Sequence, residues 1–217
     1  MTTRSVLVAT TALFSAMSAE AALPTITLFA TENCGNAYGE CRNILDNTCC
    51  KDNFNAFGFG SASIKPIYYY DIGAVYSISG NKKCGTVRNS RNGPITCLGA
   101  PGGLDGAAWF NCQSCPIANP NQKRGGSLPS FEMPEEFKIG GQGNCTNTVS
   151  PDKLTFVDGH TFEIGPNTPD NVTALLYDYA MKDHVFGDLP AELLEYEVEH
   201  DGIEARAAAI IARRSDA

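Results

Sequence analysis

Short apolar runs interrupted by polar residues characterise the first half of the chain. Five such runs are rich in β-branched and aromatic residues and are separated by glycine, asparagine and proline, a composition typical of strands. They predict a mainly β fold, a small sandwich or barrel, with the Cys34–Cys50 segment as a disulfide-tied loop region. The predicted strands are Thr25–Phe29, Ile67–Ile72, Ala74–Ile78, Ile95–Leu98 and Ala107–Phe110.

Helical spacing appears only near the end of the chain. A helix capped by Asp170 and ended by Gly187 is predicted from apolar residues at Val172, Leu175, Leu176 and Tyr179. Pro190 favours the first turn of a second helix over Ala191–Glu199, and the alanine-rich Ile203–Arg214 predicts a third. Gly125–Asn147 has few apolar residues and is predicted to be disordered.

The first 21 residues have the three parts of a secretory signal peptide. Arg4 precedes an uncharged apolar run from Val6 to Met17, and Ala19-Glu20-Ala21 is a small-residue cleavage signature. The apolar run is too short to cross a bilayer, and no later run reaches the roughly 18 apolar residues that a transmembrane helix needs. We therefore expect a secreted, extracellular protein without a membrane span.

Charge divides the rest of the chain into two pieces. Residues 23–124 contain 6 acidic and 9 basic residues, a net charge of +3, whereas residues 125–217 contain 17 acidic and 6 basic residues, a net charge of −11. The opposite charges favour an intramolecular contact between a basic core and an acidic tail at low salt. Because the whole chain has a net charge of −8, we expect no nucleic-acid partner.

The same boundary separates the predicted domains. After the signal peptide at 1–21, residues 22–115 form a cysteine-rich β domain, 116–134 a linker rich in proline and glycine, and 135–217 an acidic C-terminal extension. The linker contains Lys123-Arg124, the dibasic pattern that kexin-type secretory proteases cut. We predict processing after Arg124, with the extension acting either as a solubilising tail or as a pro-segment that assists folding or masks the domain.

Eight of the nine cysteines lie in the first piece, which is typical of a disulfide scaffold in a small secreted domain. Zinc is the weaker interpretation, because the Cys112-x-x-Cys115 motif has no second such pair and no histidine in this piece, and we expect neither metal nor cofactor. The connectivity stays open, although the adjacent Cys49 and Cys50 should have different partners. The cysteines expected to pair are Cys34, Cys41, Cys49, Cys50, Cys84, Cys97, Cys112 and Cys115.

Cys145 is the odd cysteine and lies in the second piece. It tethers the tail to the core, cross-links two chains, or stays a thiol. It also lies within the sequon Asn144-Cys-Thr146, and a second sequon is Asn171-Val-Thr173. Asn144 and Asn171 are therefore predicted glycosylation sites, and a glycan on Asn144 would crowd any bridge made by Cys145.

No residue pattern amounts to a catalytic signature. His160, His184 and His200 lie in the second piece without an H-E-x-x-H motif, and are more typical of surface residues than of ligands. Asp71 and Asp105 are the candidates for the carboxylate pair of a glycosidase-like hydrolase, although such acids are more often turn residues. We therefore expect a protein that is not an enzyme, with a carboxylate-dependent hydrolase as the least favoured alternative.

Aromatic residues make carbohydrate binding the main alternative, because exposed rings stack on sugars, although such residues more often form a small core. The candidate rings are Tyr68 and Tyr70, which would share one face of a strand, and Phe54, Phe57 and Phe59. The spacing Cys34-Gly-x5-Cys41-x7-Cys49-Cys50 is also similar in part to the hevein-type chitin-binding module. That module continues with another cysteine soon after the pair, whereas the next cysteine here is Cys84.

The organisation of Met1–Arg124 resembles that of the small secreted cysteine-rich proteins of filamentous fungi, including effector-like and toxin-like members. The shared features are the signal peptide, the cysteine-rich β domain with its Cys49-Cys50 doublet, and the dibasic linker. The resemblance implies a non-enzymatic protein that acts outside the producing cell on an extracellular protein or a cell-wall target. We therefore expect a secreted interaction protein, effector-like or toxin-like and released by cleavage after Arg124, with binding to cell-wall chitin or glucan as the alternative.

Overall fold

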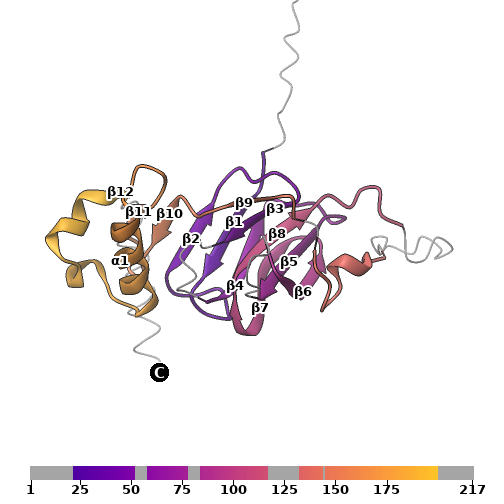
Figure 1. The fold of residues 1–217 in the computed structure, drawn as a ribbon, viewed down its shortest axis with the longest axis horizontal. Helices are drawn as coiled ribbons and strands as arrows, with labels where there is room; N and C mark the ends of the chain where they lie inside the picture. Colours follow the sequence, from indigo (N-terminus) through magenta and orange to yellow (C-terminus); the bar gives the residue numbers. More distant parts are fainter. Residues whose placement is uncertain (1–21, 52–57, 78–83, 117–131, 144, 200–217) are drawn as a thin grey trace, which may run out of the picture.

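The computed structural model describes residues 22–51, 58–77, 84–116, 132–143 and 145–199. Their strands form two sheets that pack against each other (Figure 1). The predicted mainly β fold is confirmed, as a disulfide-stabilised sandwich with few helices. No helix in this part of the chain is long and apolar enough to cross a membrane.

The strands are, in chain order, Thr25–Phe29 (β1), Tyr38–Cys41 (β2), Thr48–Lys51 (β3), Phe59–Lys65 (β4), Ile72–Ser77 (β5), Thr86–Asn92 (β6), Ile95–Leu104 (β7), Gly106–Phe110 (β8), Asn147–Val149 (β9), Lys153–Thr155 (β10), Thr161–Glu163 (β11) and Glu197–Glu199 (β12). The seven-stranded sheet has the order β12-β11-β10-β2-β1-β4-β7, and the five-stranded sheet has the order β6-β5-β8-β3-β9. Neighbouring strands are antiparallel except for β3 and β9, which are parallel.

Helical structure in the described ranges consists of α1 (Asp170–Met181) and the short 3-10 helices η1 (Glu135–Phe137), η2 (Phe186–Asp188) and η3 (Ala191–Tyr196). The predicted helix at Asp170 is confirmed, but it ends at Met181 instead of Gly187, and Pro169 is its N-cap. The predicted helix over Ala191–Glu199 is confirmed in part: Pro190 is the N-cap of η3, a 3-10 helix that ends at Tyr196, and β12 follows it and pairs with β11. The predicted helix over Ile203–Arg214 lies outside the described residues.

Two predictions for the first piece are corrected by the structure. Residues 67–71 form a turn instead of a strand, because the Asp71 carboxylate accepts a hydrogen bond from the Tyr68 N–H at 2.8 Å and the Asp71 N–H donates to the Tyr68 carbonyl at 3.1 Å. The Cys34–Cys50 segment, predicted as a loop, contains β2 and β3. β2 pairs with the nearby β1, but its other partner β10 and the partners β8 and β9 of β3 are distant in sequence, so short local patterns indicate both strands only weakly.

The five-stranded sheet is covered on both faces. One face contributes Val75 and Ala107 to the main core between the sheets, and the other contributes Tyr76 to a second cluster that includes Phe137. Residues 132–143 form this second cover, because their backbone bonds to both polar groups of Val87 and the Phe137 ring lies 4.0 Å from that of Phe110. The predicted disorder of Gly125–Asn147 is therefore wrong for its described residues.

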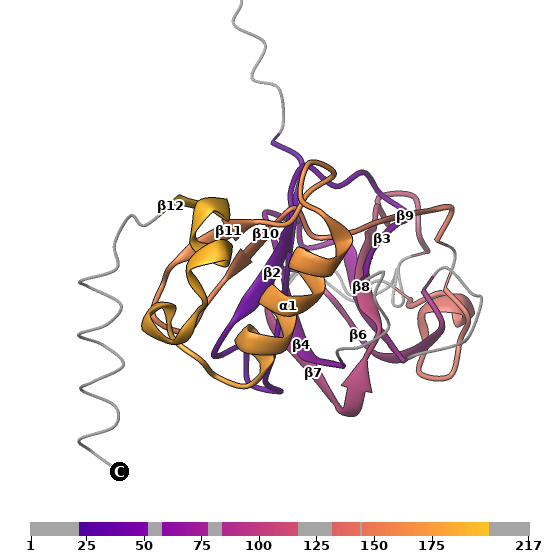
Figure 2. The ribbon, with the colours of Figure 1, turned by 60° about the vertical axis from the view of Figure 1, so that its left-hand side comes forward.

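The acidic second piece adds strands to both sheets (Figure 2). β9 pairs with β3, and β10 pairs with β2, so β2 lies between two neighbours instead of at an edge. Helix α1 lies beside these strands and places Leu176 and Tyr177 in the main core. An ion pair of 2.8 Å between Arg42 and Asp152 also joins the basic piece to the acidic one.

Four disulfides bind the first piece internally. The pairs are Cys34–Cys97, Cys41–Cys50, Cys49–Cys84 and Cys112–Cys115. Cys49 and Cys50 have different partners, and Cys112 and Cys115 pair with each other. All four bridges lie within residues 34–115, so none of them links the first piece to the acidic piece.

Cleavage after Arg124 is expected to leave the two pieces associated. Lys123 and Arg124 lie outside the described residues, but Leu154 and Phe162 of the second piece are fully buried in the main core. Each such side chain contributes about 1.5–3 kcal/mol on burial. Size-exclusion chromatography of the kexin-treated protein should give one peak at the uncut volume, and a denaturing gel should give two chains. Separation of the pieces in native buffer would contradict this expectation.

Candidate functional site

The outer face of the seven-stranded sheet carries a groove of about 630 Å³ over β1, β2 and β4. Side chains alternate along β1, so Ile26 and Leu28 are fully buried in the core. Thr25, Thr27 and Phe29 lie on the other face and line the groove. The groove is therefore a surface that the second sheet leaves uncovered.

The strand register arranges the floor of the groove in rows. Thr27 pairs with Glu40 of β2 on one side and with Ser63 of β4 on the other. Phe29 pairs with Tyr38, and their ring centroids lie 5.5 Å apart. The floor thus places hydroxyl groups and a carboxylate beside a pair of half-buried aromatic rings.

The loop at residues 31–35 forms one end wall. It is tied to the sheet by the Cys34–Cys97 disulfide, and the Ser61 hydroxyl accepts a hydrogen bond from the Cys34 N–H at 2.9 Å. The same hydroxyl donates to the Thr31 carbonyl at 2.5 Å. A β-carbon on Gly60 would overlap the Thr31 carbonyl group, so glycine at this position allows the loop to lie directly on the sheet.

Polar groups of several kinds surround the floor. Arg42 and Lys65 lie toward one end, and Phe156 and Val157, just beyond β10, complete the lining. None of the lining residues is a histidine, and the one cysteine among them, Cys34, is disulfide-bonded. Hydroxyls, charged groups and half-buried aromatic rings can bind a ligand rich in hydroxyl groups.

Little in the sequence indicates this groove, because β2 and β4 are not among the predicted strands. The segment Phe59–Lys65 does have the alternation typical of a strand. Its apolar residues Ala62 and Ile64 alternate with the polar residues Ser61, Ser63 and Lys65. Of the rings predicted from the sequence as binding residues, Phe59 is buried, at 1% exposure, while Phe54 and Phe57 lie outside the described residues.

The three consecutive tyrosines form a separate exposed cluster. Tyr68 and Tyr70 stack with centroids 5.4 Å apart and an interplanar angle of 15°, and Tyr69 meets Tyr70 edge-on at 5.2 Å. Tyr68 is 59% exposed and Tyr69 41%. Tyr68 and Tyr70 were predicted to share one face of a strand. They lie in a turn instead, and the turn brings their two rings together.

Asp71 and Asp105 do not form a carboxylate pair. Asp71 precedes β5 at one end, and Asp105 lies in the turn before β8 at the other end of the same strand, bonded to the Tyr76 carbonyl. Asp71 lies five residues before Tyr76 along the chain, roughly 17 Å of strand, which is beyond the roughly 5–10 Å that paired glycosidase carboxylates need. Asp105 instead forms an ion pair of 3.4 Å with Lys51.

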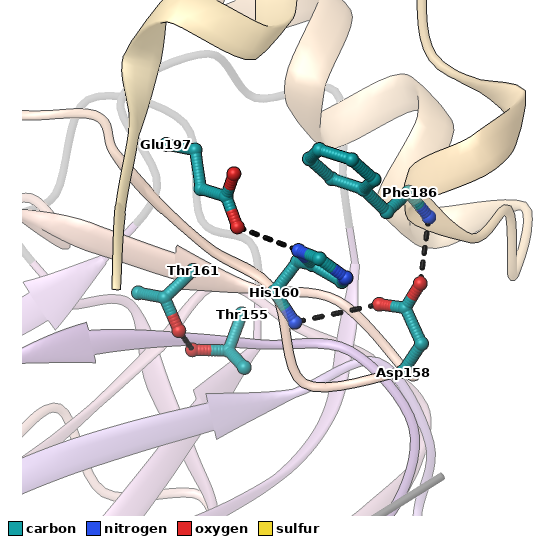
Figure 3. Close-up of polar contacts among 6 residues, drawn as sticks. All are labelled: Thr155, Asp158, His160, Thr161, Phe186 and Glu197. Atoms are coloured by element: carbon teal, nitrogen blue, oxygen red, sulfur yellow. Dashed lines mark hydrogen bonds and ion pairs between the residues drawn. The ribbon is translucent and has the colours of Figure 1, made fainter. Parts of the chain in front are cut away.

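His160 contacts residues from several elements of the second piece (Figure 3). His160 Nδ1 lies 2.6 Å from a Glu197 carboxylate oxygen, and the imidazole stacks on Phe186 with centroids 3.9 Å apart. The Asp158 carboxylate accepts the Phe186 N–H at 2.7 Å. These contacts hold β12 and η2 to the β10–β11 hairpin, so the expectation that His160 is a plain surface residue is wrong. In the described ranges, no serine, threonine or cysteine side chain hydrogen-bonds to its ring.

The remaining predicted positions are distributed over the surface or fall outside the described ranges. His184 is partly exposed, and Asn171 is exposed in the first turn of α1, where it stays a predicted glycosylation site. Asn144 and His200 lie outside the described residues, as do Lys123 and Arg124.

Comparison with known proteins gives a family for the chain. The family model ARB_05566_N, described as an N-terminal domain, matches residues 25–152. An uncharacterized secreted protein of the fungus Arthroderma benhamiae is 34% identical over 81 residues, which are 37% of this chain and 40% of that protein. The chain thus aligns with less than half of this relative. No solved structure matches it.

Replacement of Gly60 by alanine is expected to displace the 31–35 loop and destabilise the protein by about 1–3 kcal/mol, the usual cost of overpacking. Gly187→Ala is the matched control, because a β-carbon at Gly187 meets nothing within 4 Å. Urea unfolding of both variants measures the difference. Equal stability of the two variants would show that the loop does not lie against Gly60.

Asp71→Asn is expected to change the pH dependence of stability. Burial raises the pKa of the Asp71 carboxyl above its usual range, against the hydrogen bonds from the Tyr68 and Cys112 backbone. The folded state therefore holds this proton more tightly than the unfolded chain, and the wild type loses stability as pH rises through the raised pKa. Relative to the wild type, the variant should become more stable as the pH rises above about 4, where the unfolded carboxyl begins to lose its proton. Urea unfolding that shows no such relative gain would contradict the expectation.

Proposed function

Because the chain belongs to the ARB_05566_N family, and the protein is secreted, we propose that it is a non-enzymatic binding protein for a cell-wall carbohydrate, chitin or glucan. The observation that carries the proposal is the lining of the outer-face groove. It combines the hydroxyls of Thr25, Thr27 and Ser63 with the Phe29–Tyr38 ring pair.

These groups match the two surfaces of a sugar unit. Its hydroxyls both donate and accept hydrogen bonds, as do the threonine and serine hydroxyls of the floor. The apolar C–H face of a pyranose ring packs on an aromatic ring, a role that suits the half-buried ring of Tyr38. Glu40 and Lys65 add charged partners for hydroxyls or for the acetamido group of chitin.

The size of the groove is also suitable. Its volume of about 630 Å³ lies in the range of sites that bind small ligands, so it can hold a short stretch of a polysaccharide. The site lies on paired strands and its end wall is fixed by a disulfide. A rigid site reduces the entropy that binding must overcome.

A binding role without catalysis is favoured by the surroundings of the polar residues. Asp71 and Asp105 lie at opposite ends of β5, and His160 contacts a carboxylate and an aromatic ring. The acidic piece belongs to the same binding unit in this proposal, since Phe156 and Val157 line the groove.

The exposed tyrosine cluster supports a second candidate function. Tyr68 and Tyr69 place large amphipathic rings on the surface, and tyrosine is enriched at the centres of protein interfaces. An effector-like or toxin-like role would use this cluster to bind an extracellular protein. Cleavage after Arg124 would then act on a protein whose two pieces stay together.

Tyr38→Ala is expected to weaken polysaccharide binding about tenfold, the loss of about 1.4 kcal/mol from one ring–sugar contact. Depletion assays on insoluble chitin and on β-glucan measure the affinity of the full-length protein. Glu40→Gln should weaken binding less, because the amide keeps the size and acceptor of the carboxylate.

Tyr68→Ala is the matched control, since it also removes a tyrosine ring but outside the groove. Binding that is kept in Tyr68→Ala and lost in Tyr38→Ala supports the groove. The reverse result assigns carbohydrate binding to the tyrosine cluster. Absence of binding of the wild type to both polysaccharides would reject the carbohydrate proposal and favour the protein-binding candidate.

A further inference from the structure

Three cysteine sulfur atoms from separate segments meet at the face of the five-stranded sheet that residues 132–143 cover. Cys49 lies in β3, Cys84 precedes β6, and Cys145 precedes β9. The three sulfur atoms all lie within 4.8 Å of one another. Cys49 and Cys84 form a disulfide, and Cys145 is a thiol. A nucleophilic group and a bond that it can attack are therefore side by side.

The backbone fixes Cys145 from both sides. Before it, Gly143 has a φ of +61°, its N–H donates to the Glu136 carbonyl at 2.9 Å, and a β-carbon there would lie 2.7 Å from the Tyr76 ring. After it, the Thr146 N–H donates to the Asn47 carbonyl at 2.7 Å. The pairing of β9 with β3 then places Thr148 opposite Cys49. The position of Cys145 beside the disulfide thus follows from the sheet register and from Gly143, which both its positive φ and its close approach to Tyr76 require to be glycine.

A buried phenol completes the cluster. Tyr76 is fully buried, and its hydroxyl has no hydrogen-bond partner at ordinary distance. Burial, and then the neighbouring Cys145, raise the pKa of Tyr76 far above its usual range, so the phenol stays protonated. A protonated phenol beside a sulfur atom can donate a hydrogen bond to the anion that forms during exchange.

We propose that Cys145, Cys49 and Cys84 form an internal thiol–disulfide exchange site. The Cys145 thiolate attacks one sulfur of the Cys49–Cys84 bridge, a new S–S bond forms, and the electron pair of the broken bond stays on the other sulfur. That sulfur takes up the proton that Cys145 gave up. One disulfide and one thiol are present before and after the step, so no oxidant or reductant is consumed.

Exchange changes which parts of the chain are cross-linked. The Cys49–Cys84 bridge lies within the first piece, whereas a Cys49–Cys145 or Cys84–Cys145 bridge joins the first piece to the acidic piece across residues 117–131. Before exchange, packing alone holds the acidic piece to the first piece. After exchange, a disulfide also links them. Attack of the released thiolate on the new bridge would reverse the switch.

Disulfide mapping of the full-length wild-type protein tests the proposal. The protein is incubated in a glutathione buffer near pH 8, quenched in acid, alkylated and digested, and the cross-linked peptides are identified by mass spectrometry. We expect peptides with Cys49–Cys145 or Cys84–Cys145 bridges beside the Cys49–Cys84 peptide. Detection of the Cys49–Cys84 bridge alone, or of Cys145 bridged only to a second chain, would overturn the proposal.

Serine variants give a second, independent measurement. Cys84→Ser should form a Cys49–Cys145 bridge, and Cys49→Ser should form a Cys84–Cys145 bridge. The difference in intact mass before and after reduction should then show four disulfides in each variant. Cys34→Ser is the matched control, because Cys97 is bridged on the outer face of the other sheet and should stay a thiol together with Cys145. If Cys145 stays a thiol in both Cys84→Ser and Cys49→Ser, the proposal fails.

Tyr76→Phe tests whether the phenol hydroxyl assists the exchange. The quantity measured is the rate of exchange, which a change in packing alone would not alter. The variant keeps the buried ring and removes a hydroxyl that lacks an ordinary partner, so unfolding in urea should be unchanged or require more denaturant. The rate of exchange should fall about tenfold, because the forming sulfur anion loses a donor.

Discussion

The pairing of β10 with β2 is the contact on which the rest of the sandwich depends. Without it, β2 would be an edge strand with unpaired backbone groups, and the groove would lose the Phe156 and Val157 side of its lining. The same pairing fixes the β10–β11 hairpin, whose Leu154 and Phe162 extend the main core to helix α1. A strand contributed by the acidic half of the chain is thus an interior part of the sheet that carries the candidate site.

A related constraint acts on the five-stranded sheet. Every residue of β8, and all but the last of β5, is buried, which requires cover on both faces of the sheet. The seven-stranded sheet covers one face, and residues 132–143 cover the other through Phe137. Because this cover and β9 follow each other along the chain, the turn between them has to pass over Cys49. The cysteine cluster therefore results from how the sheet is closed, and Gly143 is the residue that permits the approach.

Local sequence signals predicted part of this architecture. β1, β5, β7, β8 and α1 were found because each is a run of β-branched, aromatic or helix-spaced apolar residues that marks its element without reference to partners. β2, β3 and β4 contain glycine, serine and cysteine, which mark strands weakly, and each of them has at least one partner strand from a distant part of the chain. The groove was missed for the same reason, since its floor exists only when β1, β2 and β4 are aligned. The cysteines were recognised as a scaffold, but the place of Cys145 follows from a parallel pairing that local patterns do not encode.

The charge boundary had suggested that opposite charges bring the two pieces together, and the structure allows the two forces to be compared. Arg42 and Asp152 form the ion pair at the junction, yet their side chains are 44% and 39% exposed. Pairs of this kind contribute about 0–1 kcal/mol and weaken with salt. Leu154, Phe162, Leu176 and Tyr177 of the acidic piece are at most 1% exposed, and each contributes more than the ion pair by its burial alone. Packing and strand pairing, which salt does not screen, therefore hold the acidic piece in place, and its excess negative charge is left on the surface, where it favours solubility.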